Sequence, residues 1–181
     1  MKKPFVTLDQ LQAIVEQYPT PFHLYDEKGI RENARRLKQA FAWNPGYKEY
    51  FAVKATPNPQ ILKILREEGC GTDCSSLTEL MMSERCGFSG PEIMFSSNDT
   101  PAEEFVLAAK LGATINLDDL THVDFLKETL GYVPETISCR YNPGGTFELS
   151  ESKEGFQVMD KPGDAKYGMT RPQIAEAYRR L

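Results

Sequence analysis

The chain has 181 residues and a formal net charge of -5 at pH 7, and 40% of its residues are hydrophobic and 26% charged. This usage is typical of a globular protein and argues against a disordered or fibrous chain, and the negative charge argues against a nucleic-acid-binding protein. No stretch approaches the ~20 apolar residues of a membrane span, and no apolar run follows the basic start of the chain. We therefore expect a cytoplasmic protein without a membrane partner, built on one core or on part of a larger one.

Two helices are predicted before the first strand. Residues 8–18 have the apolar spacing of a short amphipathic helix, and residues 20–26 are predicted to be extended. Residues 27–41 form a second helix, with Ile30 and Ala34 on its core face. We assign residues 1–48 to N-terminal helices and an extended segment that lead into the main domain, and residues 49–181 to that domain.

From Tyr50 onward, strands and helices alternate at a regular spacing. Strand-like runs centre near residues 52, 72, 94, 115 and 138. Helices are predicted between them at 59–68, 76–86, 101–111 and 119–130, each followed by a glycine as the usual stop. The alternation predicts an α/β fold with right-handed βαβ units and a parallel sheet. The short, even units favour a (β/α)8 barrel over a doubly wound sheet, with about five βα units present.

A single lysine, Lys54, ends the first strand. The preceding run Tyr50–Val53 is apolar and β-prone, which indicates a strand buried on both faces, and Thr56–Pro59 cannot extend it. Partial loss of hydration at such a position favours the neutral amine, which Schiff-base chemistry with an aldehyde requires. The more common role of a strand-end lysine is structural: its stem is buried and its charged head reaches solvent.

In a barrel, functional side chains gather at the carboxyl ends of the strands. Those ends carry Lys54, Asp73 and Arg140. A buried arginine needs an anionic partner, and a lysine, an aspartate and an arginine on one rim suit a cofactor that is both an aldehyde and an anion. Three other polar residues at these ends are interpreted as helix caps, namely Ser75, Asp118 and Thr100, the last in a capping box with Glu103.

The four cysteines do not predict a metal site. Cys70 and Cys74 have C-x3-C spacing, with no histidine nearby and no second pair at ligand spacing. Buried free thiols in a reducing compartment explain the cysteines better.

Several short blocks of this sequence occur together in one known family. In chain order they are T-P-F-H-L-Y-D (20–26), F-A-V-K-A-T-P-N (51–58), G-C-G-T-D-C-S-S-L-T-E-L (69–80), E-I-M-F-S-S-N-D-T (92–100), I-N-L-D-D (115–119), R-Y-N-P-G (140–144) and K-Y-G-M (166–169). The chain resembles the fold-type III pyridoxal-phosphate-dependent amino-acid decarboxylases, most closely the diaminopimelate decarboxylases. The resemblance implies pyridoxal 5'-phosphate as cofactor and the decarboxylation of meso-2,6-diaminopimelate to L-lysine, a step of lysine biosynthesis.

The resemblance also implies roles for individual residues. Lys54 matches the lysine that carries pyridoxal phosphate, and it is the expected catalytic residue. Asp73 and Arg140 match residues beside the cofactor, and Glu79 matches a further acidic position around the same pocket. The stretch Lys166-Tyr167-Gly168 matches a motif that the family ties to loop order and to the contacts of a homodimer.

The chain departs from the family's pattern in two ways. Many relatives read K-A-N where this chain has Lys54-Ala55-Thr56, which leaves the contacts after the lysine open. A complete barrel has eight βα units in ~250 residues, whereas the predicted strands here number five and a last helix, opened by a capping box at Thr170, runs to Leu181. The family's stacking histidine, glycine-rich phosphate loop, acidic partner of the ring nitrogen and C-terminal β-domain are not found. We expect the sequence to be truncated.

Three functions stay open at this point. The first is that of an N-terminal portion of a diaminopimelate decarboxylase, and the second that of a related decarboxylase or racemase acting on another amino acid. The third is a non-catalytic homologue that binds partners, against which the intact Lys54, Asp73 and Arg140 argue. The long stretch from Gly144 to Gly163 is predicted to be a mobile active-site segment.

Overall fold

Five short parallel strands form one sheet. The structure is a computed structural model that describes residues 4–142 and 167–181. Its strands are β1 (Tyr50–Ala52), β2 (Gly71–Cys74), β3 (Ile93–Phe95), β4 (Thr114–Leu117) and β5 (Ile137–Cys139). They pair in chain order, and each pairing is parallel. The strands lie where the alternation of the sequence predicts them, so the α/β fold with five βα units is confirmed. The segment predicted to be mobile lies outside the described residues.

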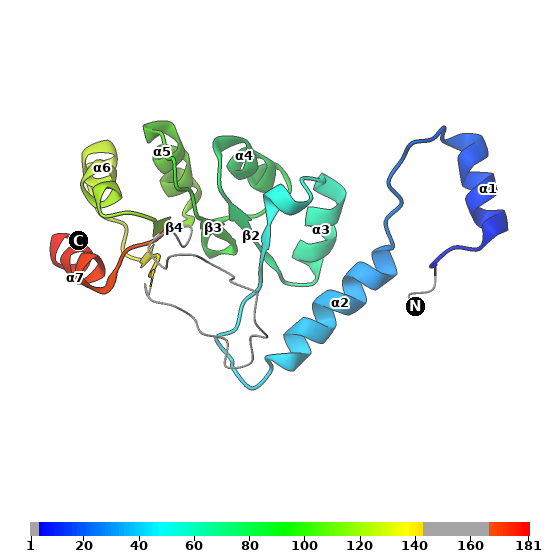
Figure 1. Cartoon of the computed structure of the whole chain (residues 1–181), viewed down its shortest axis with the longest axis horizontal. Coiled ribbons are helices and arrows are strands. Elements are labelled where there is room, and N and C mark those ends of the chain that lie inside the picture. The colour runs from blue at the N-terminus through cyan, green and yellow to red at the C-terminus, as the bar shows by residue number, and fades with distance from the viewer. Residues whose placement is uncertain (1–3, 143–166) are drawn as a thin grey trace, which may run out of the picture.

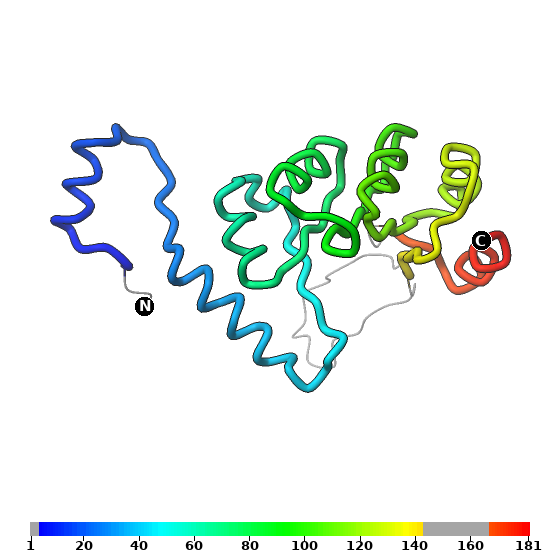
Figure 2. Tube along the Cα trace, turned by 180° about the vertical axis from the view of Figure 1, so that it is seen from behind, coloured from blue at the N-terminus to red at the C-terminus, as the bar shows by residue number. Residues whose placement is uncertain are grey.

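Helices connect the strands and cover one side of the sheet. They are α3 (Pro59–Glu67), α4 (Leu77–Arg85), α5 (Ala102–Leu111), α6 (Thr121–Leu130) and, after β5, α7 (Arg171–Arg180). Figure 1 shows α4, α5 and α6 side by side above the strands, with α3 beside β2, and the view from behind in Figure 2 gives the same succession of helices. Gly112 and Gly131 end α5 and α6 in the left-handed conformation, with φ of 70° and 75°, which confirms these predicted stops.

The burial of alternate residues shows which face of the sheet packs on the helices. One set of alternate positions in β2, β3 and β4 is almost fully buried: Thr72, Cys74, Ile93, Phe95, Ile115 and Leu117. Phe95 meets Phe105 of α5 edge-on, with 6.3 Å between ring centres, so this set points to the helices. The other set includes Asp73 and Met94, which pair laterally and are half-buried. In a barrel, the face that carries this second set is the interior.

The first strand is less buried than the sequence predicts. All three residues of β1 are half-buried, because β1 pairs with β2 alone among the described strands and forms an edge. Val53 is fully buried, but it already belongs to the 3-10 turn η1 (Val53–Ala55). The interpretation of Tyr50–Val53 as a strand buried on both faces is therefore wrong for the strand itself.

The helix caps differ from the predicted ones. Ser76, not Ser75, caps α4 by accepting a hydrogen bond from the Glu79 N–H. Pro101 precedes α5 and no side chain caps that helix end, so the capping box at Thr100 is wrong. Leu120 precedes α6, and the Asp119 side chain accepts a hydrogen bond from the Thr121 N–H at 2.8 Å, so Asp118 does not cap this helix. The capping box at the start of α7, in which Thr170 and Gln173 bond reciprocally, is confirmed.

The N-terminal helices differ in how they are packed. α1 (Leu8–Gln17) has no buried residue, and Figures 1 and 2 show it apart from the sheet. α2 (Glu27–Ala40) packs Ile30 and Ala34 against the cluster of Ile61, Leu65 and Cys70. None of the helices in the described part of the chain is long and apolar enough to cross a membrane.

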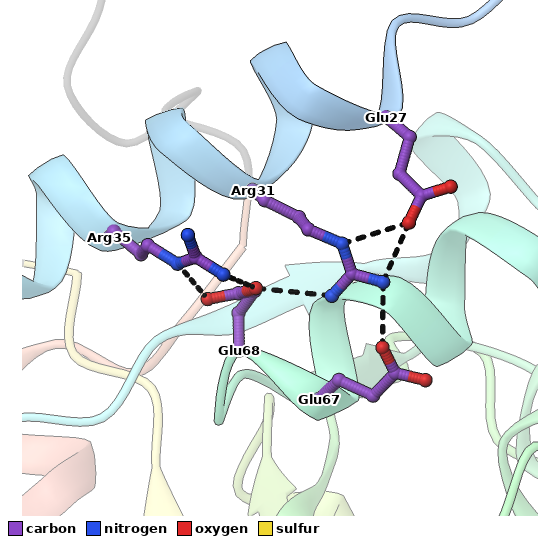
Figure 3. Close-up of polar contacts among 5 residues, drawn as sticks. All are labelled: Glu27, Arg31, Arg35, Glu67 and Glu68. Carbon is purple, nitrogen blue, oxygen red and sulfur yellow. Dashed lines mark hydrogen bonds and ion pairs between the residues drawn. The ribbon is translucent and has the colours of Figure 1, made fainter.

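Two arginines fasten α2 to the end of α3 (Figure 3). Arg35 donates from Nε and Nη2 to the two carboxylate oxygens of Glu68, each at 2.7 Å. Arg31 donates to Glu68 at 3.1 Å, to Glu67 at 2.7 Å and to Glu27 at 2.9 Å. The bidentate geometry fixes direction as well as distance. We call this set of five residues the α2–α3 clamp.

The cysteines are free, as predicted. Cys70, Cys74 and Cys86 are buried, and burial raises the pKa of each thiol. Cys139 in β5 is half-buried. A raised pKa keeps a thiol protonated and unreactive, so these side chains act as small apolar core groups.

Candidate functional site

Lys54 lies in η1, directly after the first strand. β1 ends at Ala52, and the Thr56 N–H closes the turn on the Val53 carbonyl at 3.2 Å. Asn58 then caps α3 by accepting from the Gln60 N–H at 2.9 Å. The turn and the cap between them fix where the Lys54 backbone stands. Its side chain is exposed, so the loss of hydration expected for it is not provided by the described residues.

Asp73 is the third residue of β2 and lies beside Ala52 of β1 in the parallel register. Burial raises the pKa of its carboxyl above the ordinary value, and the charge of Glu79 adds to the rise. A hydrogen bond from Ser96 and the charges of Lys54 and Arg140 act in the opposite direction. The Oδ1 atom is buried without a hydrogen-bond partner among the residues described. Such an atom is costly to leave unpaired, so it marks where a bound group would donate.

Arg140 follows β5 and forms an ion pair with a buried carboxylate. Its Nη1 lies 2.6 Å from Oδ1 of Asp118, whose side chain is 3% exposed, whereas the arginine side chain is 34% exposed. Asp118 follows β4 directly, and the Arg140 N–H donates to the carbonyl of Leu117 at 2.9 Å. The two residues therefore stand side by side at the ends of adjacent strands. The interpretation of Asp118 as a helix cap is wrong, because its carboxylate pairs with Arg140.

The three residues predicted for the site lie at the same edge of the sheet. The register pairs Ala52 with Asp73 across β1 and β2, and Asn116 with Ser138 across β4 and β5. The Ser138 hydroxyl donates to the Asn116 side chain at 2.8 Å, which shows that this row points to one face. Arg140 comes two residues after Ser138, so it is on the same face by strand alternation. The charges of Lys54 and Arg140 both act on Asp73, which is consistent with this placement.

Glu79, the further acidic residue of the predicted pocket, has a local structural role. Its carboxylate accepts from the Ser75 N–H at 2.9 Å and from the Ser75 hydroxyl at 3.1 Å. It therefore braces the turn between β2 and α4, and its charge reaches the site through its effect on Asp73.

The K-Y-G motif is partly within the described residues. Tyr167 is half exposed, Gly168 has a φ of 109°, and Lys166 lies outside the described ranges. A Cβ at Gly168 would come 2.9 Å from Arg140 Cγ. The glycine thus allows this segment to approach the site arginine closely.

Two residues of this cluster were not assigned to the site by sequence reasoning. They are Asp118, which pairs with Arg140, and Ser96, which hydrogen-bonds Asp73. Both residues directly follow predicted strands, and this position is the sequence feature that could have assigned them to the site. Their partners come from neighbouring strands, so only the register identifies them.

Residues 27–181 match the family model described as "Pyridoxal-dependent decarboxylase, pyridoxal binding domain". The chain belongs to this decarboxylase family. The matched part begins with the first residue of α2 and contains the whole described sheet. The predicted family and its pyridoxal cofactor are thereby confirmed.

Two curated proteins with similar sequences are longer than the chain. Protein TabA of Pseudomonas amygdali pv. tabaci is 37% identical over 178 residues, which are 98% of this chain and 39% of that protein. Diaminopimelate decarboxylase of Methanothermobacter thermautotrophicus is 35% identical over 170 residues, or 92% of this chain and 38% of that protein. The chain therefore spans about two fifths of the length of these curated relatives.

Solved structures of the decarboxylase family have the same fold. Diaminopimelate decarboxylase of Helicobacter pylori, complexed with L-lysine, superposes with a TM-score of 0.66 at 29% identity, covering 74% of this chain and 34% of that one. The corresponding enzyme of M. jannaschi gives a TM-score of 0.74 at 24% identity, covering 92% and 40%. The second likeness bears on the fold alone. The five strands described here are thus part of the barrel of fold-type III decarboxylases, as predicted.

Proposed function

We propose that the protein containing this chain is a pyridoxal-phosphate-dependent amino-acid decarboxylase, a carbon–carbon lyase, in which Lys54 carries the cofactor. One observation supports this most. An exposed lysine amine, a half-buried aspartate and an arginine gather at one edge of a parallel sheet, within a segment that matches the family's pyridoxal binding domain.

The residues at this edge fit the cofactor chemically. An aldehyde requires an accessible amine, and the Lys54 side chain is exposed. A guanidinium binds an anionic group by charge-assisted hydrogen bonds, and about a third of the Arg140 side chain is exposed. The Oδ1 of Asp73, which has no hydrogen-bond partner among the described residues, offers a buried acceptor, or a donor when the carboxyl is protonated.

Each of these residues would have a distinct task. Bound pyridoxal phosphate supplies a ring that accepts the electrons of the bond to the departing carboxylate. Lys54 would hold the cofactor through Nζ and move protons there, since a primary amine can do both. Arg140 would bind an anionic group by charge-assisted hydrogen bonds. Asp73, whose pKa is raised above its ordinary value by burial, would hold a proton or accept one beside the bound group.

The substrate we propose is meso-2,6-diaminopimelate, with L-lysine as product. Curated relatives named diaminopimelate decarboxylase support this choice, among them that of Methanothermobacter thermautotrophicus at 35% identity. The alternative is another amino-acid derivative. It is favoured by the relative from Niallia circulans, an L-glutamyl-[BtrI acyl-carrier protein] decarboxylase that is 28% identical over 156 residues.

The test of the cofactor role is chemical. The complete protein is incubated with pyridoxal phosphate, reduced with borohydride and digested, and the labelled peptide is identified by mass spectrometry. The label is expected on Lys54, and Lys54→Ala should lose both the label and the activity. The matched control is Lys63→Ala on the exposed side of α3, which should keep both. A label on any other lysine would refute the assignment.

The test of the substrate is a comparison of kcat/KM for carbon dioxide release. The complete protein should release carbon dioxide from meso-2,6-diaminopimelate with a higher kcat/KM than from L-lysine or L-ornithine, and L-lysine should appear in equal amount. Preference for another amino acid would support the alternative. A homodimer, a cytoplasmic location and the division of the chain at residues 48 and 49 stay predictions, which light scattering, cell fractionation and limited proteolysis would test.

A further inference from the structure

The backbone of Arg140 is held from two sides. Its N–H donates to the Leu117 carbonyl at 2.9 Å, and its carbonyl accepts from the Met169 N–H at 2.8 Å. The α-carbon of Gly168 lies so close that an added Cβ would be 2.9 Å from Arg140 Cγ. The main chain and the base of the side chain are therefore fixed. The direction of the guanidinium depends on its charged neighbours.

One carboxylate forms an ion pair with that guanidinium, and a second carboxylate responds to its charge. Asp118 Oδ1 lies 2.6 Å from Nη1, and the Asp118 side chain is 3% exposed. Asp73 is the second, since the charge of Arg140 acts on its carboxyl. Asp118 directly follows β4, the strand that pairs with β5, whereas Asp73 belongs to β2. The two carboxylates thus come from different strands, and the ion pair of Arg140 is with Asp118.

We propose that Asp118 is a positioning residue that holds the guanidinium of Arg140 toward an anionic group of the bound cofactor or substrate. This inference rests on the proposed function. In this role Asp118 acts through Arg140, with which it forms the ion pair. A buried carboxylate suits the task because it is tied to its arginine more strongly than a solvated one.

The test uses Asp118→Asn in the complete protein, with Asp124→Asn as the matched control. Asp124 forms an Asp–Arg pair with Arg180 at 2.8 Å, between the helices α6 and α7. Binding of pyridoxal phosphate and of pyridoxal is measured by absorbance titration, and the KM for substrate by steady-state kinetics. Asp118→Asn should weaken binding of the anionic ligand about tenfold, an effect between those of exposed and of fully buried charge pairs. Asp124→Asn should not.

The pattern of change identifies the ligand group. A higher dissociation constant for pyridoxal phosphate but not for pyridoxal indicates the phosphate. A higher KM with unchanged cofactor binding and little change in kcat indicates a substrate carboxylate. Either result supports the positioning role, and unchanged values of both would overturn it.

A double-mutant cycle separates positioning from general destabilisation. In an Arg140→Gln background, Asp118→Asn should have no further effect on ligand binding, because the residue through which it acts is gone. An equal loss in both backgrounds would overturn the proposal. Circular dichroism checks the fold. If Asp118→Asn does not fold, Asp118→Glu replaces it in the cycle, because the glutamate keeps the charge but displaces it. A smaller loss of ligand binding is then expected, and it should vanish in the Arg140→Gln background.

The proposed function can fail independently of this inference. Absence of a borohydride adduct on Lys54 in the unchanged protein would refute the function. An adduct on Lys54 together with wild-type binding in Asp118→Asn would refute the positioning role alone.

Discussion

The carboxylate of Glu104, in α5, accepts a hydrogen bond of 2.8 Å from the N–H of Leu77, the first residue of α4. Glu104 is 7% exposed, and its Oε2 atom is buried without a hydrogen-bond partner in the described part of the chain. A helix thus receives part of its N-terminal cap from its neighbour in the outer layer. The contact ties two successive βα units together just behind the edge of the sheet that carries the site.

Glu104→Ala should lower the free energy of unfolding by about 1 kcal/mol, the usual cost of losing an N-terminal cap. Glu104→Gln keeps an acceptor for the Leu77 N–H and should cost less. Burial raises the pKa of Glu104 in the folded protein, so the ionised form opposes folding. Stability should therefore fall as the pH rises through that raised pKa, and Glu104→Gln should abolish this part of the pH dependence. Urea unfolding between pH 4 and 8 measures both effects.

Asp73→Asn should also change how stability depends on pH. Burial raises the pKa of Asp73 in the folded state, so the folded protein binds more protons than the unfolded chain. The protonated carboxyl contributes its whole stabilisation below the pKa that Asp73 has in the unfolded chain. This stabilisation is lost as the pH rises through the pKa that Asp73 has in the folded protein. The asparagine variant should lack that loss and be more stable near pH 7. The exposed Asp99→Asn is the control, and equal pH profiles of the two variants would contradict the prediction.

Gly168→Ala should destabilise the protein more than Gly131→Ala. Both glycines have positive φ, 109° and 75°, which costs an alanine about 1 to 2 kcal/mol. Only at Gly168 would the new Cβ meet other atoms, 2.9 Å from Arg140 Cγ and 3.2 Å from its carbonyl oxygen, whereas Gly131 has open space. We expect about 1 kcal/mol of additional destabilisation from this overpacking. Thermal unfolding compares the variants, and equal losses would show that the contact is relieved without cost.

Glu68→Gln should loosen α2 from α3. The side chain of Glu68 is 8% exposed and binds both Arg31 and Arg35 (Figure 3). Hydrogen bonds from Arg35 hold the pKa of Glu68 below its ordinary value. The stabilisation is therefore present above the pKa that Glu68 has in the unfolded chain. It is lost as the pH falls through the lower pKa that Glu68 has in the folded protein.

The control for the clamp is Glu32→Gln, because Glu32 pairs only loosely with Lys28, at 3.8 Å on the exposed side of α2. At pH 7, Glu68→Gln should lower the thermal midpoint more than Glu32→Gln, and this difference should shrink toward acid pH. Hydrogen exchange of the α2 amides should accelerate in the Glu68 variant only. A difference that persists unchanged at low pH would contradict an ionic origin.

The sequence by itself determined the order, type and approximate limits of the strands and helices, and the position of Lys54 after the first strand. These features depend on contacts between near neighbours along the chain. The alternation of apolar residues, the glycines after α5 and α6 and the capping box at Thr170 each act within a few residues. The family resemblance depended in the same way on short local blocks.

Only the tertiary structure decided which polar side chains pair at the strand ends. Asp118 could cap α6 as well as pair with Arg140 on local grounds, and the parallel register of β4 and β5 selects the arginine. Glu104 caps a helix that begins 27 residues before it. The physical reason is that charge pairing and burial depend on distance in space. A shift of one residue in register would turn every side chain of a strand to the opposite face.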